Sequence, residues 1–407
     1  MSRSLRRALW LVLIAACTRK EAPPSAAAAR ATSSAASATR TAVPQGERIS
    51  ERPAACLAAE PYASAGVLAE EGRDALAADA KERALACAEE ALRLSPRLVQ
   101  ALAVRAEALA ALGRVDDARL AYARALAVDP SDPEALLGAA ELHVRRLGPS
   151  RDALEAGLEY ALRGARAATA RKERTLAARL VLVAGMAEND LGRSHLALSH
   201  LDRAAQVLAE DPDVLYERGV ALYELCRFDE AQRAFERAVA LAPDDAWAVH
   251  QLGLLAERRG ERAKADALLA RSRKLAPEDF APELAIDEET FRGDVRRAIA
   301  ALPEAERRAL DAVPVEVQDL PNGDDLLAVD PPLSPSILGL FRGPSEDEPC
   351  TAADGPRCRS IVFYRKNLVR FAHDRRELEQ QVRVTLLHEL GHLHGESDDE
   401  LRARGLE

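Results

Sequence analysis

Residues 225–243 read LCRFDEAQRAFERAVALAP, and this phrase has two counterparts earlier in the chain. Residues 112–130 read LGRVDDARLAYARALAVDP, and residues 191–204 read LGRSHLALSHLDRA. The same interval of 34 positions separates two pairs of prolines: Pro96 and Pro130, and Pro243 and Pro277. A fixed period of this length predicts helix pairs that cannot bury their apolar faces alone and therefore stack on one another.

The repeat predicts six helix pairs, which begin near residues 65, 99, 134, 178, 212 and 246. Four of them are expected to turn at Gly113, Gly192, Cys226 and Gly260. Small residues are expected where the helices cross, at Ala118, Ala231 and Ala265. Larger side chains are expected to fill the groove, at Tyr122, Phe235 and Leu269. The predicted fold class is therefore mostly α, with an α-solenoid as its first part.

This pattern resembles the tetratricopeptide repeat, although the usual tryptophan is replaced by Leu102, Leu215 or Val249. The resemblance implies a tetratricopeptide solenoid over residues 53–278, and its concave face is the expected site for a protein partner. A solenoid that serves only as a spacer is the alternative.

A second stretch, residues 386–401, reads LLHELGHLHGESDDEL. His388 and His392 are four positions apart, so on one helix both imidazoles reach the same point in space. With Glu389 they form the HExxH pattern, in which two His bind Zn²⁺ and the Glu takes a proton from water. Gly395 allows the chain to turn back, which makes Asp398 the preferred third ligand. The other candidates for the third ligand are Asp399, Glu396 and His373.

The sequence before this motif predicts a small α+β domain. Helices are expected at 286–302 and 303–312, and strands near 313–317, 338–341 and 361–364. The helix that carries the motif is expected to start at Asp374, with Glu377 as its capping partner.

Residues 284–407 resemble the small bacterial minimal-zincin domains, which share the form HExxHxxGxxD. The resemblance implies zinc binding by His388, His392 and Asp398, with Glu389 as the general base. A metzincin is excluded because the only methionines, Met1 and Met186, precede the motif. Tyr364 and Arg365 are candidate oxyanion donors, but the favoured interpretation is a core tyrosine and a surface arginine. An exposed strand of the small sheet, 338–341 or 361–364, could add an extended peptide as an extra strand.

Residues 1–17 predict a targeting segment. A basic start precedes a short apolar run, Ala8 to Ala16, that cannot span a bilayer. The run ends Ile14-Ala15-Ala16-Cys17, which resembles a bacterial lipoprotein signal and implies lipidation of Cys17. Because Thr18 follows the cysteine, the resemblance implies retention at the outer membrane, facing the periplasm. A plain N-terminal anchor or a secretory signal is the alternative.

Residues 18–52 are rich in Ala, Ser, Thr and Pro and have no apolar period, so they predict a disordered tether.

The 407-residue chain has a net charge of −10. This negative net charge does not indicate a nucleic-acid-binding surface, which requires a concentrated basic face.

The cysteines other than Cys17 are consistent with an oxidising compartment. Cys350 and Cys358 enclose a short loop and are predicted to form a disulfide. Cys56 and Cys87 pair if the segment before the first repeat packs back on it, and Cys226 is expected to be a free thiol.

Two functions follow from these features. The first is a membrane-tethered zinc metallopeptidase whose solenoid recruits a protein substrate or partner. The second is a non-enzymatic envelope scaffold in which the zincin domain is only structural. The intact Glu389 favours the first, because a structural zinc site needs no base.

Overall fold

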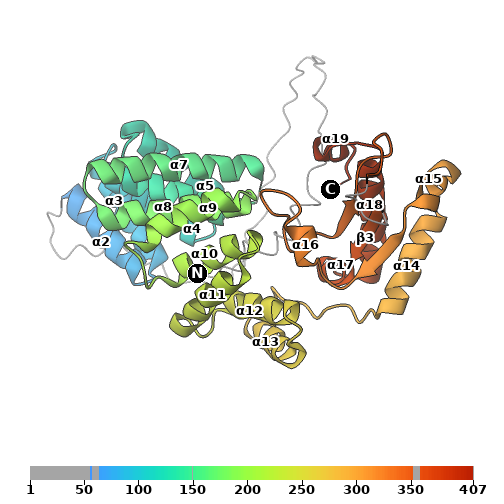
Figure 1. Ribbon diagram of the computed structural model, residues 1–407. Coiled ribbons are helices and arrows are strands. Elements are labelled where there is room, and N and C mark those ends of the chain that lie inside the picture. Colours follow the sequence, from blue (N-terminus) through green and yellow to red (C-terminus); the bar gives the residue numbers. More distant parts are fainter. Residues whose placement is uncertain (1–55, 57–63, 149, 352–357, 407) are drawn as a thin grey trace, which may run out of the picture.

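Six helix pairs follow one another in the computed structural model, which describes residue 56 and residues 64–148, 150–351 and 358–406. Figure 1 shows them as a curved stack from blue to yellow. Their bounds are α2 Ala65–Ala77, α3 Lys81–Leu94, α4 Val99–Ala111, α5 Val115–Val128, α6 Pro133–Arg145, α7 Arg151–Ala170, α8 Arg174–Asp190, α9 Ser194–Ala205, α10 Pro212–Glu224, α11 Phe228–Leu241, α12 Ala246–Arg258 and α13 Arg262–Leu275. The prediction of an α-solenoid is confirmed.

Five of the six pairs turn through one residue with a positive φ. The four residues predicted for this role have φ of 57° to 78°: Gly113, Gly192, Cys226 and Gly260. The first pair turns at Asp79, with a φ of 57°. Lys172, with a φ of 62°, lies between α7 and α8 and so connects the third pair to the fourth. Three of these six residues, Asp79, Lys172 and Cys226, therefore have a β-carbon in the left-handed region, which favours glycine.

Small residues allow the paired helices to approach closely. Ala118 and Ala231 are fully buried, as predicted, and Phe235 fills the space between α10 and α11. A β-carbon added to Gly219 on α10 would lie 2.5 Å from the Phe235 ring. This distance is shorter than van der Waals contact, so a larger residue at Gly219 would force the two helices apart.

The second part of the chain is α+β, as predicted. Its helices are α14 Glu288–Ala300, α15 Glu304–Ala309, α16 Gly323–Leu326, α17 Arg365–Phe371, α18 Arg375–Leu393 and α19 Asp398–Ala403. Its strands are β1 Val315–Gln318, β2 Gly339–Arg342 and β3 Ser360–Tyr364. All three predicted strands and both predicted early helices are present, the second as α15 and the 3-10 turn Leu310–Ala312.

The three strands form one mixed sheet in the order β1-β3-β2. β3 pairs parallel with β1, Val315 opposite Ile361, and antiparallel with β2, Phe341 opposite Ile361. Every residue of β3 is buried, because it has a strand on each side and helices against the sheet. α18 packs on this sheet, and its buried residues share one core with α14 and β3.

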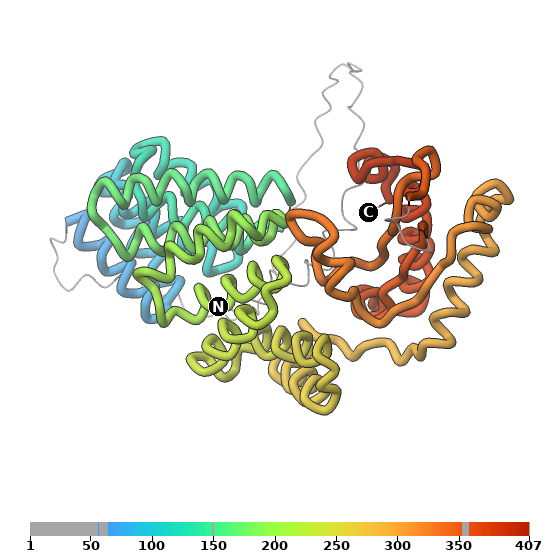
Figure 2. Tube along the Cα trace, viewed as in Figure 1, coloured from blue at the N-terminus to red at the C-terminus, as the bar shows by residue number. Residues whose placement is uncertain are grey.

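The last helix pairs of the solenoid contact the α+β domain. Glu257 on α12 forms ion pairs with Lys366, at 2.8 Å, and with Arg370, both on α17. The neighbouring Arg258 donates to the carbonyl oxygens of Pro321, at 2.8 Å, and Pro335, at 3.5 Å. Figure 2 shows the orange segment between β1 and β2 reaching toward these helices.

Two disulfides are present in the described part of the chain, Cys56–Cys87 and Cys350–Cys358. Cys226 is the one free cysteine among the described residues. None of the helices described is both long and apolar enough to cross a bilayer. The predicted signal 1–17 with Cys17 and the predicted tether 18–52 lie outside the described residues.

Candidate metal centre

α18 holds the HExxH motif at its C-terminal end. Asp374 caps the helix, because its side chain accepts from the backbone N–H of Glu377 at 2.8 Å. Glu377 reaches back to the N–H of His373, one residue before the cap, instead of to Asp374 as in a capping box. One face of the helix is buried in the core: Leu378, Val382, Leu386 and Leu390. This burial fixes the direction in which the motif side chains point.

The structure brings the three predicted metal ligands together. The Nε2 atoms of His388 and His392 are 3.1 Å apart. Asp398 Oδ1 lies 3.3 Å from Nε2 of His392 and 3.6 Å from Nε2 of His388. Gly395 makes this possible, since its φ of 82° ends α18 and lets Asp398 begin α19 beside the histidines.

Backbone carbonyls fix the tautomers of both histidines. Nδ1 of His388 lies 2.6 Å from the carbonyl oxygen of Leu406, and Nδ1 of His392 lies 3.0 Å from that of Glu396. A carbonyl only accepts, so both Nδ1 atoms must donate. In the neutral rings both Nε2 atoms then carry lone pairs, which face each other and a carboxylate oxygen. Three acceptors at this spacing repel one another unless a cation or added protons lie between them.

The spacing suits zinc. Zinc–nitrogen and zinc–oxygen bonds of about 2.0–2.1 Å in a tetrahedral site separate neighbouring ligand atoms by about 3.3 Å. The three measured separations of 3.1, 3.3 and 3.6 Å bracket this value. Asp398 is largely exposed, so solvent reaches one side of the cluster. Two imidazoles and one carboxylate are also the ligand types of a catalytic zinc site.

Glu389 is buried next to this cluster, with 5% of its surface exposed. The pKa of its carboxyl is raised to about 8, mainly by burial and in smaller part by the negative charge of Asp398. The N–H of Phe341 on β2 donates to the carboxylate and opposes this shift. A cation held by the neighbouring ligands would favour the charged form of Glu389, since opposite charges at short range lower a carboxyl pKa.

The other candidates for the third ligand have partners elsewhere. Asp399 pairs with Arg402 at 2.6 Å, and Glu396 pairs with Arg404. His373 contacts Glu377 at the far end of α18. His394 lies between Glu306 and Glu346, at 3.0 and 2.7 Å. Asp398 is therefore the acidic residue that the structure places at both histidines.

The two residues considered as oxyanion donors, Tyr364 and Arg365, are engaged in other contacts. The Tyr364 hydroxyl donates to Asp325 at 2.8 Å, and Arg365 donates to Asp319 and to the carbonyl of Ile286. Tyr364 is a buried core residue, as the sequence favoured, and Arg365 is held by its pairing with Asp319, so neither is assigned as an oxyanion donor. β3, residues 360–364, was wrong as a docking edge, because it is paired on both sides.

β2 is an edge strand, and two of its residues were missed as parts of the site. A β-carbon on Gly339 would lie 2.9 Å from Oε1 of Glu389 and 2.5 Å from Thr385. Glycine at this position therefore allows β2 to pass directly over the carboxylate. Phe341 contributes its backbone N–H, as described above. An isolated glycine inside a predicted strand was a signal for Gly339, because it often marks a close backbone approach.

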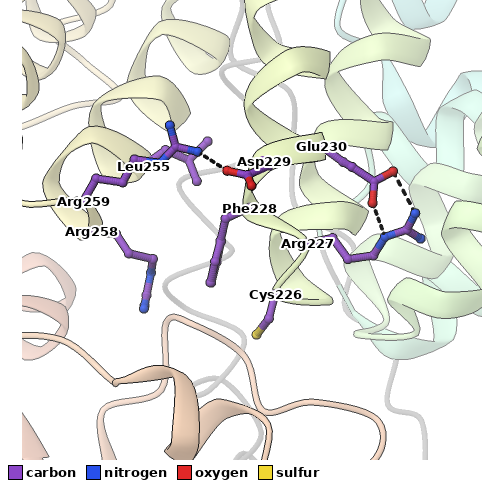
Figure 3. A pocket seen from close by; sticks show the side chains of 8 residues that line it. All are labelled: Cys226, Arg227, Phe228, Asp229, Glu230, Leu255, Arg258 and Arg259. Atoms are coloured by element: carbon purple, nitrogen blue, oxygen red, sulfur yellow. Dashed lines mark hydrogen bonds and ion pairs between the residues drawn. The ribbon is translucent and has the colours of Figure 1, made fainter.

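The cavities found at the junction of the two parts contain none of these residues. One, of about 380 Å³, is lined by Cys226, Phe228 and Arg258 and bordered by the pairs Arg227–Glu230 and Asp229–Arg259 (Figure 3). A second cavity, of about 560 Å³, lies between α12 and residues 319–323.

Burial raises the pKa of the Cys226 thiol to about 11, so this cysteine is not a thiolate nucleophile at neutral pH.

Comparisons with known proteins agree with this arrangement. Residues 310–406 match the family of zincin-like metallopeptidases, and residues 99–142 and 212–245 match tetratricopeptide repeats. The chain therefore contains tetratricopeptide repeats followed by a C-terminal zincin-like metallopeptidase domain. A search of curated proteins finds no match.

Several solved structures resemble the solenoid. PilF of Pseudomonas aeruginosa is 16% identical, with a TM-score of 0.46 over 53% of this chain and 92% of PilF. PilW, a type IV pilus biogenesis factor, is 18% identical, with a TM-score of 0.46 over 56% of this chain and 97% of PilW. YrrB, described as having an unusual peptide-binding site, is 21% identical, with a TM-score of 0.37 over 47% of this chain and 93% of YrrB.

Proposed function

We propose that this protein is a zinc-dependent metallopeptidase that hydrolyses peptide bonds. One observation carries the proposal: the Nε2 atoms of His388 and His392 and one oxygen of Asp398 converge at a spacing that suits zinc, beside Glu389. A site built only for structure would need no buried carboxylate next to its ligands.

Each residue has a definite task in this proposal. His388, His392 and Asp398 would hold the zinc ion, which supplies a Lewis acid that activates water near neutral pH and polarises a carbonyl. Glu389 accepts the proton of the attacking water and passes it to the amine of the leaving peptide. Its buried position keeps other bases and bulk water away from this proton transfer.

β2 provides the edge on which a peptide could lie. The N–H of Tyr364 on β3 donates to the carbonyl of Leu338, so the alternate residues Gly339 and Phe341 direct their backbone groups away from β3. An extended substrate that pairs with these groups would run past Glu389. The Phe341 N–H then exchanges the Glu389 carboxylate for a substrate carbonyl, which releases Glu389 for its role as base.

The solenoid and the N-terminal segment complete the proposal. The repeats would recruit a protein substrate or a partner on their concave face, as stacked helix pairs commonly do. A lipidated Cys17 would anchor the protein to the outer membrane, facing the periplasm. The two disulfides support an oxidising compartment of this kind.

The test uses the full-length protein in detergent with one equivalent of zinc and a library of unstructured ten-residue peptides, read by mass spectrometry. The wild type should bind about one zinc and cleave peptides. Glu389→Gln should retain zinc and lose cleavage, while Asp398→Ala should lose most of the zinc. If the wild type binds zinc but cleaves nothing, the scaffold function is favoured instead.

A further inference from the structure

α19 ends in a turn whose hydrogen bonds define a Schellman motif. The N–H of Leu406 donates to the carbonyl of Leu401, and the N–H of Gly405 donates to that of Arg402, both at 3.0 Å. Gly405 has a φ of 75°, which such a turn requires. The turn leaves the carbonyl of Leu406 free to point at another group, and it accepts from Nδ1 of His388 at 2.6 Å.

The end of α18 is built in the same way. The N–H of Glu396 donates to the carbonyl of Gly391, and the N–H of Gly395 donates to that of His392. The carbonyl that follows the glycine, on Glu396, accepts from Nδ1 of His392. Two successive helices thus end in the same turn, and in each the residue after the glycine orients one histidine.

The second turn is held in place by the motif itself. Leu401 is fully buried, and a β-carbon on Gly391 would lie 2.2 Å from its Cδ2. Gly391 lies between the two histidines in the sequence, so its missing side chain provides the space for Leu401. Leu406 is also buried, with 9% of its surface exposed. The position of the Leu406 carbonyl is therefore fixed by packing and does not depend on a surface contact.

We infer that the Gly405–Leu406 turn is a positioning element of the metal centre, which holds His388 ready for zinc through the Leu406 carbonyl. This inference rests on the proposed zinc site. A hydrogen bond at Nδ1 directs the lone pair of Nε2 toward the metal and makes the ring a better ligand. Loss of such a partner reduces metal affinity about 10–100-fold.

The experiment measures zinc affinity by competition with a chelator, and the visible spectrum of the cobalt(II) form, for the full chain and four variants. A chain that ends at Arg404 lacks the turn. Gly405→Val keeps Leu406 but disfavours the left-handed backbone. Leu406→Met retains a buried apolar side chain and the backbone carbonyl at position 406. Arg383→Ala changes an exposed residue elsewhere on α18 and serves as the control.

The shortened chain and Gly405→Val should raise the zinc Kd about 10–100-fold and change the cobalt spectrum, while Leu406→Met and Arg383→Ala should match the wild type. Thermal melting followed by circular dichroism shows which variants are folded. If the shortened chain does not fold, the inference is tested with Gly405→Val alone. A Kd within about twofold of the wild type in a folded Gly405→Val protein, with an unchanged spectrum, overturns the inference. A wild type that binds no zinc overturns the proposed function instead.

Discussion

Gly339 on β2 lies directly against the carboxylate of Glu389 on α18. A β-carbon at Gly339 would be 2.9 Å from Oε1 of Glu389, which real side chains do not tolerate. The edge strand and the buried carboxylate are therefore fitted to each other, and any larger residue must move one of them. Zinc ligation does not involve this contact, so catalysis and metal binding can be separated by changing it.

Gly339→Ala should reduce peptide hydrolysis more than tenfold and leave the zinc Kd within about twofold of the wild type. The added methyl group displaces Glu389 or shifts β2, and either change misplaces the base. Overpacking of this kind also destabilises a core by about 1–3 kcal/mol. Steady-state hydrolysis and zinc titration on the same preparation measure the two effects. The matched control is Gly293→Ala on α14, where the new methyl group meets only the ends of arginine side chains at 3.5 Å or more. Equal activity in both variants would contradict the prediction.

Glu257→Gln should separate the unfolding of the solenoid from that of the zincin-like domain. Glu257 and Arg370 are about 11% and 13% exposed, so the substitution leaves buried positive charge without its main partner. The expected loss of stability is about 3 kcal/mol. Differential scanning calorimetry should show two transitions where the wild type has one. The exposed pair Arg93–Glu90 on α3 provides the control, and Glu90→Ala should leave the melting profile unchanged.

His250 should make the protein less stable in acid. The pKa of its ring is lowered to about 3, mainly by burial and in smaller part by the positive charges of Arg370 and Arg273. The unfolded chain takes up a proton near pH 6.5 and the folded chain does not, so stability falls as the pH drops from 6.5 toward 3. The slope from this residue is about 1.4 kcal/mol per pH unit.

Urea unfolding at pH 7, 6, 5 and 4 measures this dependence. His250→Gln retains a polar group near Ser272, which lies 3.3 Å from Nδ1, but does not titrate. Its stability should therefore fall less steeply with acid than that of the wild type. If the free energy of unfolding of the two proteins changes with pH in the same way, His250 is not the cause of the acid sensitivity.

Lys172→Gly should stabilise the solenoid by up to about 1 kcal/mol, because an exposed lysine has a φ of 62° in the turn between α7 and α8. Three other helix turns of the solenoid have glycine at their positive-φ residue. Lys172→Ala has the same loss of charge but retains the β-carbon, and it should have little effect. Thermal denaturation of the two variants side by side isolates the backbone contribution. An equal gain in stability in both variants would show that the effect comes from the loss of the lysine charge and not from the backbone.

The solenoid was predictable because its contacts are local. Each helix packs mainly on its neighbours in the sequence, so the repeating phrase was sufficient to place all six pairs. The turns at Asp79 and Lys172 were missed, since neither residue type signals a positive φ as glycine does. Sheet order was not predicted, because the pairing of Val315 with Ile361 joins distant residues and is decided by packing.

At the candidate metal site, too, some features were predictable from the sequence and others were not. Spacing alone predicted that His388, His392, Glu389 and Asp398 lie together, because the chemistry of these side chains is specific to residue type. The carbonyls of Leu406 and Glu396 could not be predicted, since every residue carries a carbonyl and only the fold selects which ones face the imidazoles.

The Cys56–Cys87 disulfide has a mechanical consequence. A pull on the chain ahead of Cys56 passes through the sulfur–sulfur bond into α3 and bypasses α2 altogether. The first helix of the solenoid therefore lies inside a covalently closed loop and carries no tension. A protein held by its N-terminal segment on a moving surface would keep its end repeat folded under load, where a non-covalent end helix would peel away.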